Sequence, residues 1–255
     1  MEQRWERHYP FLQLDHPALE RLVGAAFPGV RVLAAEPLAG GLRNTNYRVR
    51  LAGPAARDVV LRLYTADPAA CRREAALAAL VGGTVPVPPV LYAAPDADPP
   101  FAVTAWIEGM RLDDLLRAGD PTNEGAATAA GEVLARIHSV TFPSAGFLGP
   151  DLTIREPLDL SDTGWAGHME HFLVRGRAGA ALGGDLTQRL RRFVAVHAPR
   201  LASLRGARTL VHADYKPWNL LLCRPDDLRR SAAQDTRSAP DAGEAWRMAG
   251  VLDWE

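Results

Sequence analysis

The chain has 255 residues, of which 47% are hydrophobic and 23% are charged, as in an ordinary globular protein. Its formal net charge of -1 provides no general attraction to nucleic acid or to anionic lipid, so we expect neither as a partner. The sequence has no apolar run of about 18 residues, and its opening stretch MEQRWERHYP lacks the apolar segment of a signal peptide. We therefore expect a cytoplasmic protein without a membrane segment, and the oligomeric state stays open.

The first hundred or so residues read mainly as strands. Apolar residues at helical spacing first predict a short amphipathic helix over residues 17–27. Strand-like segments follow at residues 30–38, 46–51 and 58–64. Because their connections are rich in turn residues, these segments predict an antiparallel meander.

A longer helix is predicted after the meander. Asp67 and Pro68 supply an N-cap and a proline for the first turn, and Gly82-Gly83 supply the stop. The next stretch, TVPVPPV, is extended and broken by prolines. Residues 101–107 read as one more strand.

After Gly109 the pattern changes to helices. They are predicted over residues 111–119, 123–140 and 185–198, and Pro199 ends or kinks the last one. Two of these helices carry apolar residues on one face, Ala127, Ala130, Leu134 and Ile137 in one and Leu186, Leu190, Phe193 and Val194 in the other.

The chain then returns to strand. Residues 209–222 contain two short apolar runs, Leu210-Val211 and Leu220–Leu222, which read as buried strands, and residues 247–254 read as the final strand. Residues 223–246 show no periodicity and are rich in Asp, Arg, Ser, Ala and Pro, which predicts a mobile surface loop.

This order of elements predicts an α+β fold with two parts. Residues 1–107 would form an antiparallel sheet plus one helix, and residues 108–255 would be mostly helical. A hinge is expected near Trp106 to Gly109. Clefts between such parts are common sites for small ligands.

Arg62 lies in the strand DVVLRLY among apolar neighbours. Because side chains alternate along a strand, Arg62 shares a face with Val60 and Tyr64. A covered arginine needs an anionic partner, and Glu74 lies on the apolar stripe of the following helix. We expect these two side chains to pair; the alternative is that both are solvated.

Gly40 and Gly41 lie in the turn LAGGLRNTNY between two predicted strands. Paired glycines let the backbone approach a phosphate closely and present its N–H groups to it. They serve a plain hairpin equally well.

The segment LVHADYKPWNLLL, residues 210–222, encloses polar groups between two apolar ends. The spacing of Asp214 and Asn219 lets one loop aim a carboxylate at an acceptor hydroxyl while an amide oxygen reaches a metal. Lys216, the only lysine among the 29 basic residues, could place its charge on a transferring phosphoryl group. Asp253 ends the last apolar strand, and one amide with one carboxylate suffices for Mg²⁺.

HADYKPWNLLL followed by GVLDWE resembles the aminoglycoside phosphotransferase and choline kinase-like family. The resemblance extends to LAGGLRNTNYRVR, VVLRLY, CRREAALAAL, FAVTAWIEG and AAGEVLARIHS, so it covers nearly the whole chain. It implies a protein-kinase-like two-lobed fold with a nucleotide-binding N-lobe at residues 1–107. The C-lobe, residues 108–255, would carry the catalytic loop and the metal-ligand strands. Because the family continues beyond D-W-E, we expect this lobe to be truncated at its C-terminus.

The resemblance also implies an ATP-dependent kinase with ATP and Mg²⁺ as cofactors. It would phosphorylate a hydroxyl of a small molecule such as an aminoglycoside, a choline-like alcohol or a sugar. Asp214 would be the catalytic base or orienting carboxylate, assisted by Lys216, while Asn219 and Asp253 would bind Mg²⁺ and His212 would buttress the loop. The nucleotide would contact Gly40, Gly41, Arg62 held by Glu74, and the backbone of Ala105, Trp106 and Ile107.

Two other functions stay open at this point. The chain could be a non-catalytic nucleotide-binding module or an inactive truncated fragment of such a kinase. It could also be an aspartate-dependent hydrolase built on Asp214, which would consume ATP without an acceptor. The sequence does not choose among the acceptors.

Overall fold

The computed structural model describes residues 7, 9–38, 43–53, 56–119, 123–159, 161–204, 206–224 and 245–254. The chain forms two compact units. Unit 1 comprises residues 1–138, 150–152 and 211–255, and unit 2 comprises residues 139–149 and 153–210. The predicted division into residues 1–107 and 108–255 stays a prediction.

Unit 1 is built on a five-stranded antiparallel sheet with the strand order β1-β2-β3-β5-β4. Its strands are β1 (Arg31–Pro37), β2 (Thr45–Ala52), β3 (Arg57–Leu63), β4 (Val90–Ala94) and β5 (Phe101–Ala105). The predicted meander of β1, β2 and β3 is therefore confirmed, and so is β5. Strand β4 was not predicted, because the prolines that precede it break the apolar pattern.

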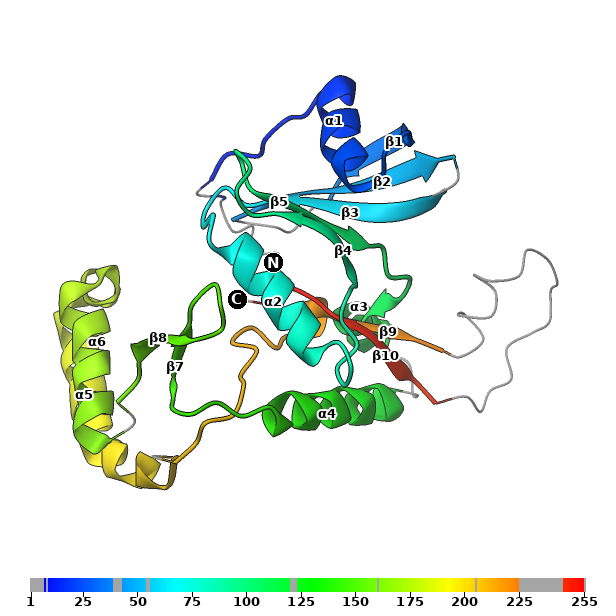
Figure 1. Cartoon of the computed structure of the whole chain (residues 1–255). Coiled ribbons are helices and arrows are strands. Elements are labelled where there is room, and N and C mark those ends of the chain that lie inside the picture. The colour runs from blue at the N-terminus through cyan, green and yellow to red at the C-terminus, as the bar shows by residue number, and fades with distance from the viewer. Residues whose placement is uncertain are drawn as a thin grey trace. The chain divides into compact units, whose positions relative to one another are not determined.

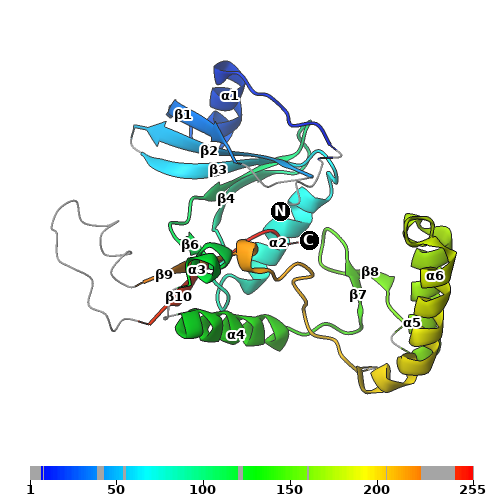
Figure 2. The same cartoon turned by 180° about the vertical axis from the view of Figure 1, so that it is seen from behind.

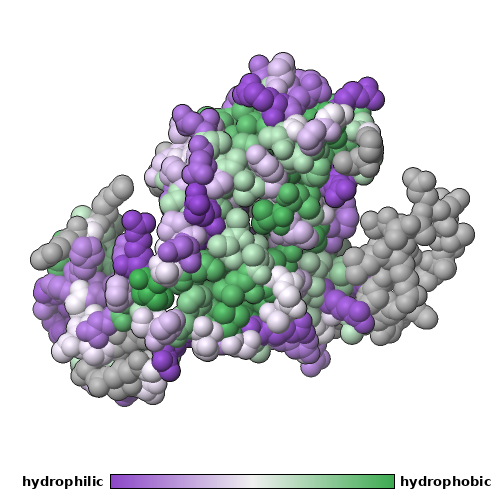
Figure 3. Space-filling model, in the orientation of Figure 1, coloured by the Kyte–Doolittle hydropathy of each residue, from purple (hydrophilic) through white to green (hydrophobic). Residues whose placement is uncertain are grey.

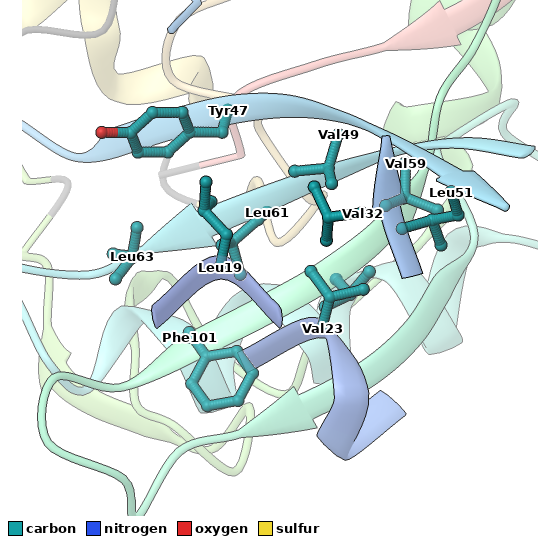
Figure 4. Packing of buried hydrophobic residues seen from close by; sticks show 11 residues of the cluster. Leu19, Val23, Val32, Tyr47, Val49, Leu51, Val59, Leu61, Leu63 and Phe101 are labelled. Carbon is teal, nitrogen blue, oxygen red and sulfur yellow. The ribbon is translucent and has the colours of Figure 1, made fainter. Parts of the chain in front are cut away.

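One face of this sheet packs against helix α1 (His16–Ala26). The Asp15 carboxylate caps the helix by accepting a hydrogen bond of 2.9 Å from the Ala18 N–H. Leu19 and Val23 point from α1 into the core, where they meet alternate residues of the strands (Figure 4). The buried members of this core are Leu19, Val23, Val32, Tyr47, Val49, Leu51, Val59, Leu61, Leu63, Phe101 and Val103.

Helix α2 (Ala70–Val81) lies on the other face of the sheet, opposite α1 (Figures 1 and 2). The predicted N-cap was wrong, because α2 begins only after Ala69. The Asp67 carboxylate instead accepts a hydrogen bond of 3.1 Å from the Ala69 N–H, within the turn before the helix. The predicted end is confirmed, since Gly82 is the C-cap residue.

A second, three-stranded sheet of unit 1 has the order β10-β9-β6. Its strands are β6 (Met110–Arg111), β9 (Leu220–Cys223) and β10 (Arg247–Val251), and only β6 was not predicted. The predicted strand at Leu210-Val211 was wrong, because these residues form no strand and Val211 is 62% exposed. The predicted loop over residues 223–246 lies mostly outside the described residues.

Two predicted helices follow β6, namely α3 (Leu112–Ala118) and α4 (Asn123–Ser139). Gly119 ends α3 in the left-handed conformation, with a φ of 66° that favours glycine. The predicted apolar face of α4 was partly wrong, since Ala127 is exposed. Its buried residues are Ala126, Ala129, Ala130, Val133 and Ile137. In an alanine-rich helix the residue types alone define the face poorly.

Unit 2 contains a two-stranded sheet of β7 (Gly146–Leu148) and β8 (Ile154–Pro157). Its helical segments are α5 (Asp162–Glu170), η1 (His171–Arg175), α6 (Arg177–His197) and η2 (Ala198–Leu204). The predicted helix over residues 185–198 is part of α6, which has a kink at Gly183 and ends just before Pro199. Leu186 is 39% exposed and Phe193 is 61% exposed, so the predicted apolar stripe is only partly covered.

None of the helices in the described ranges is long and apolar enough to cross a membrane. In unit 1, apolar surface is visible over α2 and α4 with hydrophilic residues around it (Figure 3).

An N-terminal segment is attached to the start of β2 by side chains of that strand. The Thr45 hydroxyl accepts a hydrogen bond of 3.0 Å from the Leu12 N–H. The Tyr47 hydroxyl accepts one of 3.1 Å from the Leu14 N–H and donates one of 2.8 Å to the Leu12 carbonyl. Tyr47 therefore provides hydrogen-bond partners for two backbone groups of a segment outside the helices and strands.

His212 ties two distant loops of unit 1 together. The Nε2 atom of its buried ring lies 2.9 Å from the Leu252 carbonyl oxygen. The Nδ1 atom accepts a hydrogen bond of 3.3 Å from the Asp214 N–H. The carbonyl requires a donor and the N–H requires an acceptor, so the ring is neutral and carries its proton on Nε2. Trp254 packs on this ring at a centroid distance of 4.6 Å.

The Tyr47 hydroxyl gives a direct test of the N-terminal attachment. Tyr47→Phe should lower the free energy of unfolding by about 1–3 kcal/mol, because it leaves the Leu14 N–H and the Leu12 carbonyl unpaired. Urea denaturation followed by circular dichroism would measure the change. Tyr92→Phe is the control, since the Tyr92 ring packs on Phe101 and its hydroxyl makes no hydrogen bond within the described part of the chain. Equal losses in the two variants would contradict this role.

Burial lowers the pKa of His212 below 6.5, and this gives a prediction for stability against pH. Above about pH 6.5 the histidine is neutral in both states; below it the unfolded chain binds the proton first. The free energy of unfolding should therefore fall as the pH drops, by up to about 1.4 kcal/mol per pH unit from this group. His212→Gln should show a shallower dependence in denaturation series from pH 7.5 to pH 5.5. If the free energy of unfolding of His212→Gln depended on pH as steeply as that of the wild type, the His212 ring would not be neutral and buried in the folded protein.

Candidate functional site

A cleft with a volume of about 2280 Å³ lies in unit 1. All the predicted site residues that the structure describes line it, namely Arg62, Glu74, Ala105, Trp106, Ile107, Asp214, Lys216, Asn219 and Asp253. Gly40 and Gly41 lie outside the described residues. Segments far apart in the sequence therefore bring their polar groups to one place.

Asp214 is held by groups of its own loop. Its carboxylate pairs with Lys216 Nζ through Oδ1 and accepts a hydrogen bond of 2.9 Å from Asn219 Nδ2 through Oδ2. The short η3 helix (Pro217–Asn219) turns the chain back, so that Asn219 returns to Asp214. Ala213 has a φ of 67°, a left-handed conformation that is unusual for alanine and that directs the loop.

The orientation of the Asn219 amide follows from its partners. Nδ2 donates to both the carboxylate and the main-chain carbonyl of Asp214, at 2.9 and 3.0 Å. Both partners are acceptors, so the nitrogen has to face them. The Oδ1 atom of Asn219 is consequently the end of the amide that can ligate a cation.

Arg62 joins three elements of unit 1. It extends from β3 on the face opposite the core, and its Nη2 atom lies 3.2 Å from Glu74 Oε1 on α2 and 2.8 Å from Asp253 Oδ1 after β10. The side chains of Arg62 and Glu74 are each only 16% exposed. The predicted Arg62–Glu74 pair is therefore confirmed. Its contact with Asp253 was not predicted.

In this cluster the shielded Arg62 and Glu74 interact with each other and with the more exposed Asp253. Burial alone lowers the pKa of Arg62, but the carboxylates of Glu74 and Asp253 outweigh burial and keep the pKa above its ordinary value. Burial raises the pKa of Glu74 to about 7, although the Arg62 guanidinium and the Tyr64 hydroxyl oppose this shift. Arg62 is thus always cationic, whereas Glu74 is the group of the cluster that can change its charge near neutral pH.

Tyr64 belongs to this cluster and was not singled out as a site residue from the sequence. Its hydroxyl donates a hydrogen bond of 2.9 Å to Glu74 Oε2. Burial raises the pKa of Tyr64, so the hydroxyl keeps its proton and remains a donor. The alternation that places Tyr64 on the same face as Arg62 was the signal that could have indicated it.

Asp253 follows β10 in a conformation that aims its side chain into the cleft. Its φ of 62° is left-handed, and the flanking Leu252 N–H donates a hydrogen bond of 2.8 Å to the Asn219 carbonyl. The loops of residues 212–219 and 252–254 are thus joined at two points, here and at His212. This double connection keeps Asp214, Asn219 and Asp253 in the same cleft.

The backbone at the predicted hinge offers fewer free N–H donors than the sequence suggested. The Ala105 N–H donates to the Pro89 carbonyl at 2.9 Å, and the Trp106 N–H donates to the Asp58 carbonyl at 3.3 Å. Of the three predicted positions, Ile107 is the one whose N–H makes no backbone hydrogen bond within the described ranges. Any donor to a bound ligand among these three is therefore the Ile107 N–H.

Trp218 was also not singled out from the sequence, although it lies in the same loop as Asp214 and Lys216. It lines the cleft with an indole ring that is 48% exposed, and Lys216 Nζ lies 4.8 Å from the ring centroid. This cation–π contact holds the ammonium group of Lys216 beside Asp214.

Solved structures resemble the chain in fold. Aminoglycoside phosphotransferase APH(4)-Ia, solved with AMP-PNP and hygromycin B, matches with a TM-score of 0.59 at 19% identity over 92% of this chain and 70% of that one. Aminoglycoside phosphotransferase APH(2'')-Ib with bound ADP gives 0.59 at 16% identity over 94% and 70%. The macrolide 2'-phosphotransferase MphH from Brachybacterium faecium gives 0.56 at 17% identity over 92% and 71%. These likenesses confirm the predicted protein-kinase-like α+β fold.

None of the curated proteins compared with the chain is a match. A family model does match, and its description is the phosphotransferase enzyme family. The match extends over residues 34–230, which is most of the chain and includes Arg62, Glu74, Asp214 and Asn219. The chain therefore belongs to the phosphotransferase enzyme family.

Proposed function

We propose that this chain transfers the γ-phosphoryl group of ATP to a hydroxyl of a small molecule. The observation that supports this most strongly is the meeting of Asp214, Asn219 and Asp253 with the cations Arg62 and Lys216 in one cleft. Phosphoryl transfer asks the protein mainly to position its reactants and to stabilise charge. A carboxylate, two cations and metal-ligating oxygens supply both.

Asp214 would receive the acceptor hydroxyl. One of its oxygens contacts Lys216 and the other contacts Asn219, so the carboxylate has a fixed direction before a substrate binds. It would accept the hydrogen bond of the hydroxyl, aim the oxygen at the γ-phosphorus and take up its proton. Lys216 would reach a transferring phosphoryl oxygen from the same loop.

Asn219 and Asp253 would hold Mg²⁺. Their amide and carboxylate oxygens are the hard ligands that this ion prefers, and Mg²⁺ needs few of them because it keeps waters and phosphate oxygens. When bound, the ion would neutralise charge on the phosphate oxygens.

Arg62 would contact the phosphates of the nucleotide. Its Nε atom is buried without a hydrogen-bond partner among the described residues, so it is a donor that a phosphate oxygen would satisfy. Glu74 and Tyr64 would keep the guanidinium in place. The backbone at Ala105 to Ile107 would contact the adenine base, through the Ile107 N–H as its donor.

The acceptor is proposed only as a class of hydroxylated small molecules, such as an aminoglycoside, a choline-like alcohol or a sugar. The hygromycin B and AMP-PNP found in a structure of similar fold support an acceptor and a nucleotide of these kinds. A nucleotide-binding module without activity is the alternative function. It would bind ATP and phosphorylate nothing, whereas a hydrolase would consume ATP without any acceptor.

Asp214→Ala tests the proposal. The variant should lose about 10²–10⁴-fold in turnover, because the hydroxyl loses the group that aligns and deprotonates it. Its affinity for Mg·ATP should stay within about threefold of the wild type, since Asn219 and Asp253 remain. Product would be identified by mass spectrometry on a panel of aminoglycosides, choline, macrolides and sugars, with affinity measured by calorimetry.

Asp96→Ala is the matched control, because Asp96 is an exposed surface carboxylate that forms an ion pair with Arg72. It should retain full turnover. Near wild-type activity in Asp214→Ala would show that Asp214 does not align or deprotonate the acceptor hydroxyl. ATP binding by the wild type with no phosphorylated product from any acceptor would favour the inactive module.

A further inference from the structure

Four side chains outside the reacting groups form a connected cluster at the hinge, which we call the hinge clamp: Arg48, Asp58, Trp106 and Glu108. Arg48 belongs to β2 and Asp58 to β3, while Trp106 and Glu108 follow the end of β5. From the sequence, a functional role was expected only for the backbone of Trp106, and none for the side chains of the other three residues.

Strand register brings the first two residues together. Arg48 lies opposite Val60 and Arg50 lies opposite Asp58, so Arg48 and Asp58 are diagonal neighbours on the face of the sheet that also carries Arg62. Arg48 Nε donates a hydrogen bond of 2.7 Å to Asp58 Oδ2. The two side chains are 27% and 16% exposed, so the pair is partly shielded from water.

Trp106 is held in this cluster by its ring and by its backbone. The Arg48 guanidinium lies over the indole, with Cζ 4.0 Å from the ring centroid. The Trp106 N–H donates to the Asp58 carbonyl at 3.3 Å. Nε1 of the indole donates a hydrogen bond of 2.8 Å to Glu108 Oε1, which also lies 3.5 Å from Arg48 Nη2. The contacts close a ring that includes both strands and the hinge.

We propose that Arg48 is a positioning residue for nucleotide binding, which acts by holding the hinge backbone through the stacked Trp106 ring. This rests on the proposed function, in which the backbone of Ala105 to Ile107 contacts the adenine base. The Ala105 and Trp106 N–H groups are bonded within the protein, so the base would depend on the direction of the Ile107 N–H. That direction is fixed by the preceding residue, which the clamp immobilises.

The proposed role of Arg48 concerns nucleotide binding and not the phosphoryl-transfer step. The reacting groups lie on the loops that carry Asp214 and Asp253, and none of the contacts of the hinge clamp involves those loops. Loss of the clamp should therefore raise the KM for ATP and the Kd for a nucleotide analogue while the kcat is retained. If Arg48 had a purely structural role, its loss would lower thermal stability without raising the KM for ATP selectively over a change in kcat.

Arg48→Met is the variant that tests the inference, since methionine keeps an apolar stem and removes the guanidinium. We expect it to weaken the binding of Mg·AMP-PNP about tenfold in calorimetry, from the loss of a partly desolvated cation–π contact and its ion pair. Turnover at saturating ATP should stay within about twofold. Arg50→Met is the control, because Arg50 also bonds to Asp58, at 3.2 Å, whereas the guanidinium stacked on Trp106 is that of Arg48. It should bind AMP-PNP like the wild type.

Glu108→Ala supplies a second, surface variant whose folding is not at risk, because the Glu108 side chain is 61% exposed. It removes the partner of the indole N–H and should weaken AMP-PNP binding about two- to fivefold. Wild-type affinity in both Arg48→Met and Glu108→Ala would overturn the role of the clamp while leaving the proposed function intact. A wild-type protein that does not bind Mg·AMP-PNP would overturn the proposed function and this inference together.

Discussion

The structure of the site depends on one shared cation. Arg62 bonds at the same time to Glu74 on α2 and to Asp253 at the end of β10, so a single guanidinium holds the sheet, a helix and the last strand around the cleft. Arg62 and Glu74 are each only 16% exposed, so either one alone would be a poorly solvated charge, and such charges are costly unless they are paired. The pairing also keeps Arg62 extended toward the place where a phosphate would bind, with its Nε still unpaired in the described structure.

A second constraint fixes the direction of the reacting groups. Ala213 and Asp253 both adopt left-handed backbone conformations, which non-glycine residues adopt at some cost. His212 and the Leu252 N–H join the two loops and stabilise these conformations. Both turns that aim carboxylates into the cleft therefore carry backbone strain.

The sequence allowed much of this arrangement to be predicted. The alternation in β3 placed Arg62 opposite the core, and the helical spacing of Glu74 identified its partner. The five-residue spacing of Asp214 and Asn219 indicated that one loop carries both groups, but their mutual hydrogen bond of 2.9 Å was not predicted. Each of these predictions used a local period, of a strand, a helix or a loop, that translates directly into a direction in space.

Features that depend on distant contacts could not be predicted in this way. The contact of Arg62 with Asp253 joins residues 191 positions apart, and no local pattern indicates it. Strand β4 was hidden by the prolines that precede it, and the α4 face was obscured by alanines that are common on either side of a helix. Hydrogen bonds of the Ala105 and Trp106 N–H groups to other segments also removed two donors that the sequence left available.

A crystal structure of the chain with AMP-PNP and Mg²⁺ would test the central claim most directly. We expect the metal at about 2.0–2.1 Å from Asn219 Oδ1 and from a carboxylate oxygen of Asp253, with the terminal phosphate between Arg62 and Asp214. Arg62 would then contact a phosphate oxygen while keeping Glu74 as its partner. A nucleotide bound outside the cleft, or a metal ligated by other side chains, would contradict the assignment of this site to phosphoryl transfer.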